Sequence, residues 1–157
     1  MAGNRGPAIT VDGIVPFRAG LKSAGSSFPK MLAKANKRAV SIIVPVARSN
    51  VSGLNSTNLA GHGIGKMQAL VAPTIKAAQS QVAAQIKAGS GVAFGMGALL
   101  GAKKWRQFAP WVGNDWTLSG PDDGPYGIAP AVDSTAPEFV EAYGKEMDEL
   151  TRLAFPS

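Results

Sequence analysis

The two signs of charge are separated along this chain. Residues 1–114 contain 14 Lys and Arg side chains and one acid, Asp12, which gives a net charge of +13. Residues 115–157 contain nine acids and two bases, which gives −7. The acidic segment can cover the basic body of its own chain or that of a neighbouring subunit. Alternatively, the basic body can bind a polyanion such as nucleic acid, because phosphate neutralisation supplies most of non-specific affinity.

Composition narrows the class of protein further. The 157 residues suit one domain, and the 45% of hydrophobic residues indicate a globular fold, while 19 Gly and 11 Pro indicate many loops. The chain has no Cys and one His, His62, and no acid stands between Asp12 and Asp115. Thiolate chemistry, Cys-based zinc sites and paired carboxylates in that region are therefore excluded. We expect no enzyme, no cofactor and no metal.

No membrane or export segment is expected. The N-terminus lacks an apolar run behind a basic start, so we expect a protein made in the cytoplasm. Residues 89–102 are uncharged but too short to span a bilayer.

Residues 17–48 carry apolar side chains at steps of three and four, which is helical spacing. The Lys and Arg side chains fall mostly off this stripe, so we expect an amphipathic helix with a basic outer face. Pro29, after Ser26 and Ser27, suits the first turn of the main helix. Pro45 lies inside the pattern and is expected to kink or end the helix near Val44. The stripe consists of Phe17, Leu21, Ala24, Phe28, Met31, Ala35, Ala39, Ile42 and Val46.

The rest of the chain completes an α+β prediction. Residues 1–16 form an N-terminal arm, and residues 49–66 form a long polar loop whose Gly-rich part does not match a phosphate-binding loop. Residues 67–102 are expected to form a β-hairpin turning near Ala78 and Gln79, followed by a third strand. A C-terminal helix is expected over 137–155, with Pro137 in its first turn and Thr135 or Ser134 as its cap. We thus expect a long N-terminal helix and a C-terminal helix packed on a small antiparallel sheet.

Residues 103–136 form a Trp-rich and then Pro/Gly-rich loop. Its three Trp side chains stand among bases, an arrangement that can stack nucleic-acid bases but also typifies protein interfaces. Pro110 and Gly113 indicate a folded loop rather than a flat stacking surface, which favours an interface or core role. Predicted interface residues here are Trp105, Arg106, Phe108, Trp111 and Trp116.

Residues 94–114 contain the run Phe94-Gly95-x-x-x-Leu99-Leu100-Gly101-Ala102-Lys103-Lys104-Trp105-Arg106-Gln107-Phe108, followed by Pro110-Trp111-x-Gly113-Asn114. This stretch resembles neck and tail-completion proteins of long-tailed bacteriophages of actinobacteria. The element Tyr126-Gly127-Ile128-Ala129-Pro130-Ala131 and the terminal Leu153-Ala154-Phe155-Pro156 are similar to the same family. The resemblance implies a non-enzymatic virion protein, located in the neck, that forms a ring of subunits. A ring of six, stacked against connector, stopper, tail-terminator or tube proteins, is the expectation, with genomic DNA passing nearby.

Charge segregation adds a physical expectation to this resemblance. Glu146, Asp148 and Glu149 are predicted to face outward from the C-terminal helix and to meet the basic helical segment of the next subunit or ring. The alternative from a different class is a basic, non-specific nucleic-acid-binding protein that uses the 30–48 helix and the 103–106 cluster.

Overall fold

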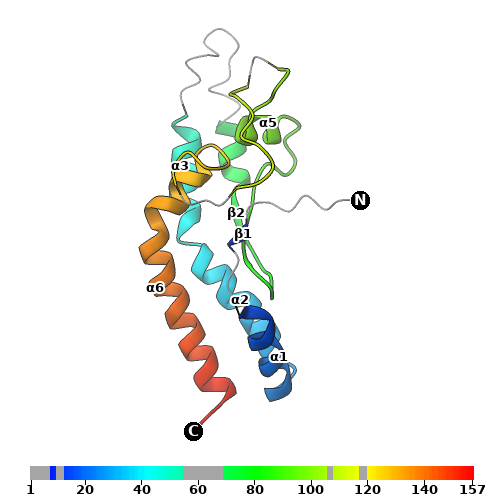
Figure 1. The fold of residues 1–157 in the computed structure, drawn as a ribbon, viewed down its shortest axis with the longest axis vertical. Coiled ribbons are helices and arrows are strands. Elements are labelled where there is room, and N and C mark those ends of the chain that lie inside the picture. Colours follow the sequence, from blue (N-terminus) through cyan, green and yellow to red (C-terminus); the bar gives the residue numbers. More distant parts are fainter. Residues whose placement is uncertain (1–7, 10–12, 55–68, 106–107, 117–119) are drawn as a thin grey trace. The chain divides into compact units, whose positions relative to one another are not determined.

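The computed structural model describes residues 8–9, 13–54, 69–105, 108–116 and 120–157 and has an α+β fold (Figure 1). Its helices are α1 (Ile14–Ala24), α2 (Phe28–Val40), α3 (Ile43–Ser52), α5 (Gly95–Leu100) and α6 (Ile128–Ala154), with a 3₁₀ turn η1 (Ala72–Thr74). Its strands are β1 (Ala8–Ile9), β2 (Lys76–Ala78) and β3 (Ala84–Lys87), in the sheet order β1-β3-β2. Strands β1 and β3 are antiparallel, with Ala8 opposite Gln85 and Ile9 opposite Ala84.

The chain consists of two compact units. Unit 1 contains residues 1–42, 77–87 and 137–157, and unit 2 contains residues 43–76 and 88–136. Two of the crossings between units fall beside helix-disturbing prolines, since α6 passes from unit 2 to unit 1 at Pro137 and Pro45 follows the crossing at residue 43. A proline inside a helix removes one backbone hydrogen bond, so it is a natural boundary of a compact unit.

The core of unit 1 joins α1, α2 and the C-terminal part of α6. Its fully buried members are Ile14 and Leu21 of α1, Leu32 of α2 and Leu150 of α6. Around them pack the partly buried Phe17, Phe28, Met31, Met147 and Ala154. The predicted N-terminal stripe is confirmed in part: Leu21, Ala35 and Ala39 are buried, but Ala24 is exposed, and the buried Ile14 and Leu32 lie outside the stripe.

Unit 2 buries a separate set of apolar residues from α3, the η1 region, α5 and the start of α6. Asn50 of α3 donates from Nδ2 to the Gly127 carbonyl at 3.1 Å. A Cβ at Gly127, whose φ is 76°, would lie 2.6 Å from Cγ2 of Val51, so only glycine permits this approach. The larger buried side chains are Ile43, Val44, Val51, Val71, Ile75, Leu99, Leu100, Ile128 and Val132.

The N-terminal helical region is interrupted twice. Pro29 lies in the first turn of α2 after Ser27, as predicted, although the Ser27 side chain makes no capping hydrogen bond. The second interruption is at residues 41–42, not at Val44, and Pro45 stands in the first turn of α3. The cause is the ring of Pro45, which cannot accommodate the carbonyl four residues earlier, at Ser41. Helix α3 then runs to Ser52, so the predicted loop does not begin at residue 49; most of that loop, with His62, lies outside the described residues.

The C-terminal helix begins nine residues before the predicted start. Helix α6 starts at Ile128, where the amides of Ile128 and Ala129 bond the Pro125 carbonyl, and Pro137 lies inside it. Thr135 is not a cap: its Oγ1 donates to the Ala131 carbonyl at 2.7 Å within the helix. Ser134 makes the same kind of bond, to Ala131 at 3.3 Å. The capping prediction was wrong because these hydroxyls are satisfied by the preceding helical turn.

The sheet differs from the prediction in two of its three strands. Strand β3 has the expected alternation, with Ala84 and Ile86 buried and Lys87 exposed. The first hairpin strand is short, because residues 69–74 form helical and 3₁₀ turns that accommodate Pro73. The expected third strand within 89–102 is the helix α5 instead, and β1 supplies the third strand. The glycines mark a close approach, since a Cβ at Gly95 would lie 2.8 Å from Cα of Gly89.

Candidate functional site

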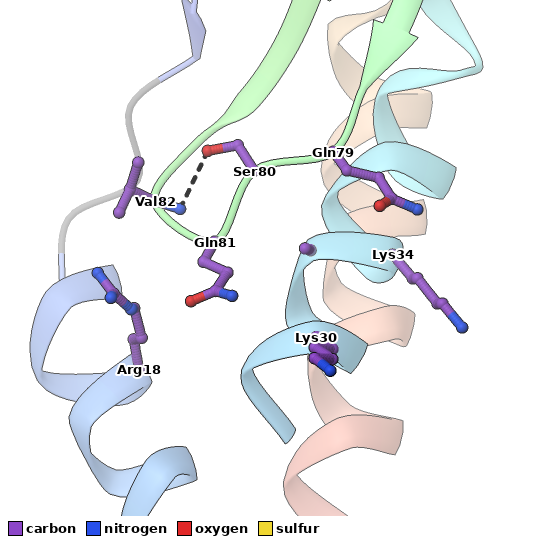
Figure 2. Close-up of a pocket in the computed structure, with 8 residues that line it drawn as sticks. Arg18, Lys30, Lys34, Gln79, Ser80, Gln81 and Val82 are labelled. Atoms are coloured by element: carbon purple, nitrogen blue, oxygen red, sulfur yellow. Dashed lines mark hydrogen bonds between the residues drawn. The ribbon is translucent and has the colours of Figure 1, made fainter. Parts of the chain in front are cut away.

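Unit 1 carries a basic groove whose walls are described residues. It encloses about 590 Å³ between α1, α2 and the connection from β2 to β3 (Figure 2). Arg18 of α1 rises toward the β2–β3 connection, and Gln81 of that connection hangs between Arg18 and Lys30 of α2 (Figure 2). The basic groove is lined by Arg18, Lys30, Ala33, Lys34, Gln79, Ser80, Gln81 and Val82.

Hydrogen bonds hold in place the wall that the β2–β3 connection forms. Asn36 of α2, fully buried, donates from Nδ2 to the Ser80 carbonyl at 2.8 Å. The Ser80 hydroxyl accepts a hydrogen bond from the Val82 amide at 3.2 Å, which fixes the turn (Figure 2). The other polar atom of Asn36, Oδ1, is buried without a partner among the described residues. A structure tolerates such a cost where the hydrogen bond of the same group organises the backbone, and here it organises the basic groove.

The charged side chains that line the basic groove are all positive. The groove presents three exposed cations, Arg18, Lys30 and Lys34, and no acid is among its lining residues. Lys30 and Lys34 are one turn apart on the same helix face, so their charges repel each other weakly when nothing binds. An anionic group entering the basic groove would relieve this repulsion.

The predicted acidic residues do not all behave alike. Glu146 faces its own chain, where its carboxylate takes a bidentate hydrogen bond from Arg38 at 2.7 and 2.5 Å. This pairing raises the pKa of Arg38 above its ordinary value, chiefly through the hydrogen bond to Glu146. Asp148 and Glu149 are exposed, as predicted. For Glu146, then, the acidic segment neutralises the basic body of the same chain.

The neighbouring turn of α6 carries a second, fully exposed pair. Lys145 donates from Nζ to the Glu141 carboxylate at 2.6 Å, four residues apart. The hydrogen bond from Lys145 lowers the pKa of Glu141. This part of the helix surface is thus locally balanced, unlike the basic groove.

The Trp-rich segment belongs to unit 2, whereas Glu146, Asp148 and Glu149 belong to unit 1. Phe108 is part of the packing, because its ring covers Gly97, where a Cβ would lie 2.7 Å from the ring. Backbone bonds tie the segment to α5, from Ala102 to the Ala109 carbonyl at 2.9 Å and from Val112 to the Leu100 carbonyl at 3.0 Å. Tyr126 adds a bond from its hydroxyl to the Pro110 carbonyl at 2.7 Å. The segment is therefore a folded loop, as expected.

The predicted interface aromatics separate into two kinds. Trp111 and Trp116 are half-buried, and the indole Nε1 of Trp116 is buried without an acceptor among the described residues. Trp105 is 57% exposed and carries the Nζ of Lys104 at 5.5 Å from its ring centre. Arg106 lies outside the described residues. Trp105 is therefore the one of these four aromatics whose ring is mostly free for a partner.

Sequence reasoning placed Lys30 and Lys34 on a basic face but missed the basic groove. The missing wall comes from residues 79–82, which return over α2 from more than 40 positions along the chain. Asn36, which holds that wall, lies beside Ala35 and outside the predicted apolar stripe, and its burial is seen only in the structure. A buried polar side chain needs a partner, and the Ser80 carbonyl of the returning segment supplies it.

The described residues contain no group of three or more His, Asp or Glu side chains placed to hold a metal ion. No helix found in this part of the chain is both long and apolar enough to cross a membrane. No family model, no curated protein and no solved structure matches the chain.

Proposed function

We propose that the protein is a structural subunit of a bacteriophage neck, which forms a ring of six and joins the DNA-filled head to the tail. In this role it is a tail-completion or head-to-tail connector protein, found in the virion, without enzymatic activity. Its partners are copies of itself and the adjoining neck and tail proteins. The resemblance of residues 94–114 to that family motivates the proposal.

One structural observation supports it most directly: unit 1 presents opposite charges on different elements and leaves many of them without partners. Exposed cations on α1 and α2 include Arg18, Lys30 and Lys34, and exposed acids on α6 include Asp148 and Glu149. Within the described part of the chain, the ion pairs are Arg38–Glu146 and Lys145–Glu141. Subunits that carry complementary charges on different faces associate head to tail, and such contacts close into rings when the rotation permits.

The test is the location and effect of the chain in virus particles. In particles that carry an epitope-tagged copy, gold-labelled antibody should bind at the junction of head and tail. Particles assembled without the chain should accumulate as filled heads and separate tails. Intact head–tail particles made without the chain would refute the proposal.

A second candidate, a non-specific nucleic-acid-binding protein, is favoured by the three cations of the basic groove. It predicts binding to random duplex DNA that weakens steeply with salt. Three phosphate contacts give a slope of about 3 in a plot of log affinity against log salt concentration. Fluorescence anisotropy of labelled DNA over a salt series measures this slope, and no binding near physiological salt would exclude the candidate.

A further inference from the structure

We propose that the basic groove of one copy receives the C-terminal end of α6 from a neighbouring copy. Asp148 and Glu149 of the neighbour would face Arg18, Lys30 and Lys34, and Leu153 would cover Val82. The inference rests on the proposed ring, because it names the two surfaces by which adjacent subunits join.

The receiving surface combines charge with an apolar contact. Val82, which is 45% exposed, lies in the wall of the basic groove on the side of Arg18, and Lys30 and Lys34 stand on the opposite side (Figure 2). A phosphate backbone would pair with the cations but would leave this side chain in water. A protein segment that carries both acids and an apolar side chain satisfies both features, because apolar burial supplies free energy that charges alone do not. The observations therefore favour a protein over a nucleic acid.

The last two turns of α6 have the matching composition. Asp148 and Glu149 are exposed, and Leu153, one turn after Glu149, is 49% exposed. Glu149 and Leu153 lie on one side of the helix, at the rim of a small hollow whose other wall is Met31, Ala35 and Arg38 of α2. The end of α6 thus offers an exposed apolar side chain beside exposed acids, and the basic groove offers an exposed apolar side chain together with cations.

A chain cannot make this contact with its own groove as it is folded. The C-terminal part of α6 packs on α2 through Leu150, where Glu146 engages Arg38. No residue of α6 is among those that line the basic groove. The two surfaces therefore belong to different faces of unit 1, and their contact between copies is head to tail, as a ring requires.

The basic groove is also prepared before anything binds. The hydrogen bond from Asn36 to Ser80 and the Ser80–Val82 bond hold the wall in position. A partner that enters a fixed wall loses less conformational entropy than one that must order it.

The experiment reverses each charged surface and then both. Lys30→Glu with Lys34→Glu reverses the basic groove, and Asp148→Lys with Glu149→Lys reverses the helix end. Glu146 is left unchanged because its reversal would break an ion pair within the subunit. Control variants carry equal charge changes on exposed residues elsewhere: Lys76→Glu with Lys87→Glu, and Asp122→Lys with Asp133→Lys.

Association is measured by sedimentation velocity and native mass spectrometry over a range of protein concentrations, with circular dichroism as a check of folding. Either double reversal should weaken self-association about a hundredfold or more, because like charges then face each other. The control variants should associate like the unaltered chain. The quadruple variant, with both surfaces reversed, should regain association, as should an equimolar mixture of the two double variants.

The outcomes that overturn the inference are specific. Undiminished assembly of both reversed variants would show that subunits join through other surfaces, and the neck role would stand. An unaltered chain that stays monomeric at every concentration would also overturn it, and labelling of particles would then judge the neck role separately. DNA binding that is lost in the groove variant, together with assembly that the helix-end variant retains, would assign the basic groove to phosphate instead.

Discussion

Of two leucines in α6 that are three positions apart, Leu150 should contribute mainly to folding stability and Leu153 mainly to association between copies. Leu150 is 4% exposed in the core of unit 1, whereas Leu153 is 49% exposed on the same helix. Replacing either with Ala removes the same atoms and changes helix propensity by the same small amount. Differences between the two variants therefore report on surroundings alone.

The expected costs follow from burial. Removing about three carbon atoms from full burial loses roughly 2.4 kcal/mol at about 0.8 kcal/mol for each, and the residual cavity brings Leu150→Ala to about 3–4 kcal/mol. Leu153 is already half in water and leaves no closed cavity, so Leu153→Ala should cost about 1 kcal/mol or less. With a urea slope of about 2 kcal/mol/M, the Leu150 variant should unfold about 1.5–2 M earlier than the unaltered chain.

Urea denaturation followed by circular dichroism measures both costs. Low protein concentration keeps association from adding to apparent stability. Sedimentation velocity on the same variants should then show weakened association for Leu153→Ala. Equal losses of stability in the two variants would refute the assignment of the inward face of α6, on which both the core and the docking surface depend.

Three further predictions concern local features. Gly101→Ala should destabilise by more than about 2 kcal/mol in thermal or urea unfolding, because its φ is 75° and a Cβ would overlap the facing loop carbonyl; Gly113→Ala, with open space at φ 93°, should cost less. Arg38→Met should cost about 0.5–1 kcal/mol, and less at 1 M salt, because Arg38 itself is 59% exposed in this ion pair. NMR titration of the Glu141 carboxyl group should give a pKa below the usual 4.5, and Lys145→Ala should bring that pKa back toward 4.5. The stabilisation from the Lys145–Glu141 pair is present above pH 4.5 and is lost as the pH falls through the lowered pKa of Glu141.

Helix faces could be predicted from the sequence, whereas helix ends could not. The apolar spacing identified Leu21, Phe28 and Met31 of the unit 1 core, because burial requires one continuous stripe, but it missed Ile14 and Leu32. The start of α6 was missed because Pro137 looks like a helix start, yet the preceding residues, beginning at Ile128, are satisfied by packing in unit 2. Local signals at a proline do not reveal whether tertiary contacts compensate for the lost hydrogen bond.

The basic groove could be predicted only in part. Lys30 and Lys34 follow from the helical period, but the wall around Val82 depends on a chain segment that returns from far along the sequence. The expected third strand failed for a different reason, since Gly-rich residues 89–95 make a close backbone crossing that leads into α5. Long-range packing decides the first outcome and a local glycine turn the second, and no strand or helix period encodes either of them.

The structure separates the residues of the Trp-rich segment that build unit 2 from those open to a partner. Gly101 is required by a backbone approach and Phe108 by its contact with Gly97, so a chain needs these residues to fold this loop whatever it binds. Folding of the loop does not account for Trp105 and Lys104 in the same way, because both side chains are exposed and they contact each other. Any resemblance in the packed positions therefore bears on the scaffold. If the proposed function holds, Trp105 in unit 2 and the basic groove in unit 1 are the first places to test for a partner, because each leaves exposed groups that the packing of its unit does not require.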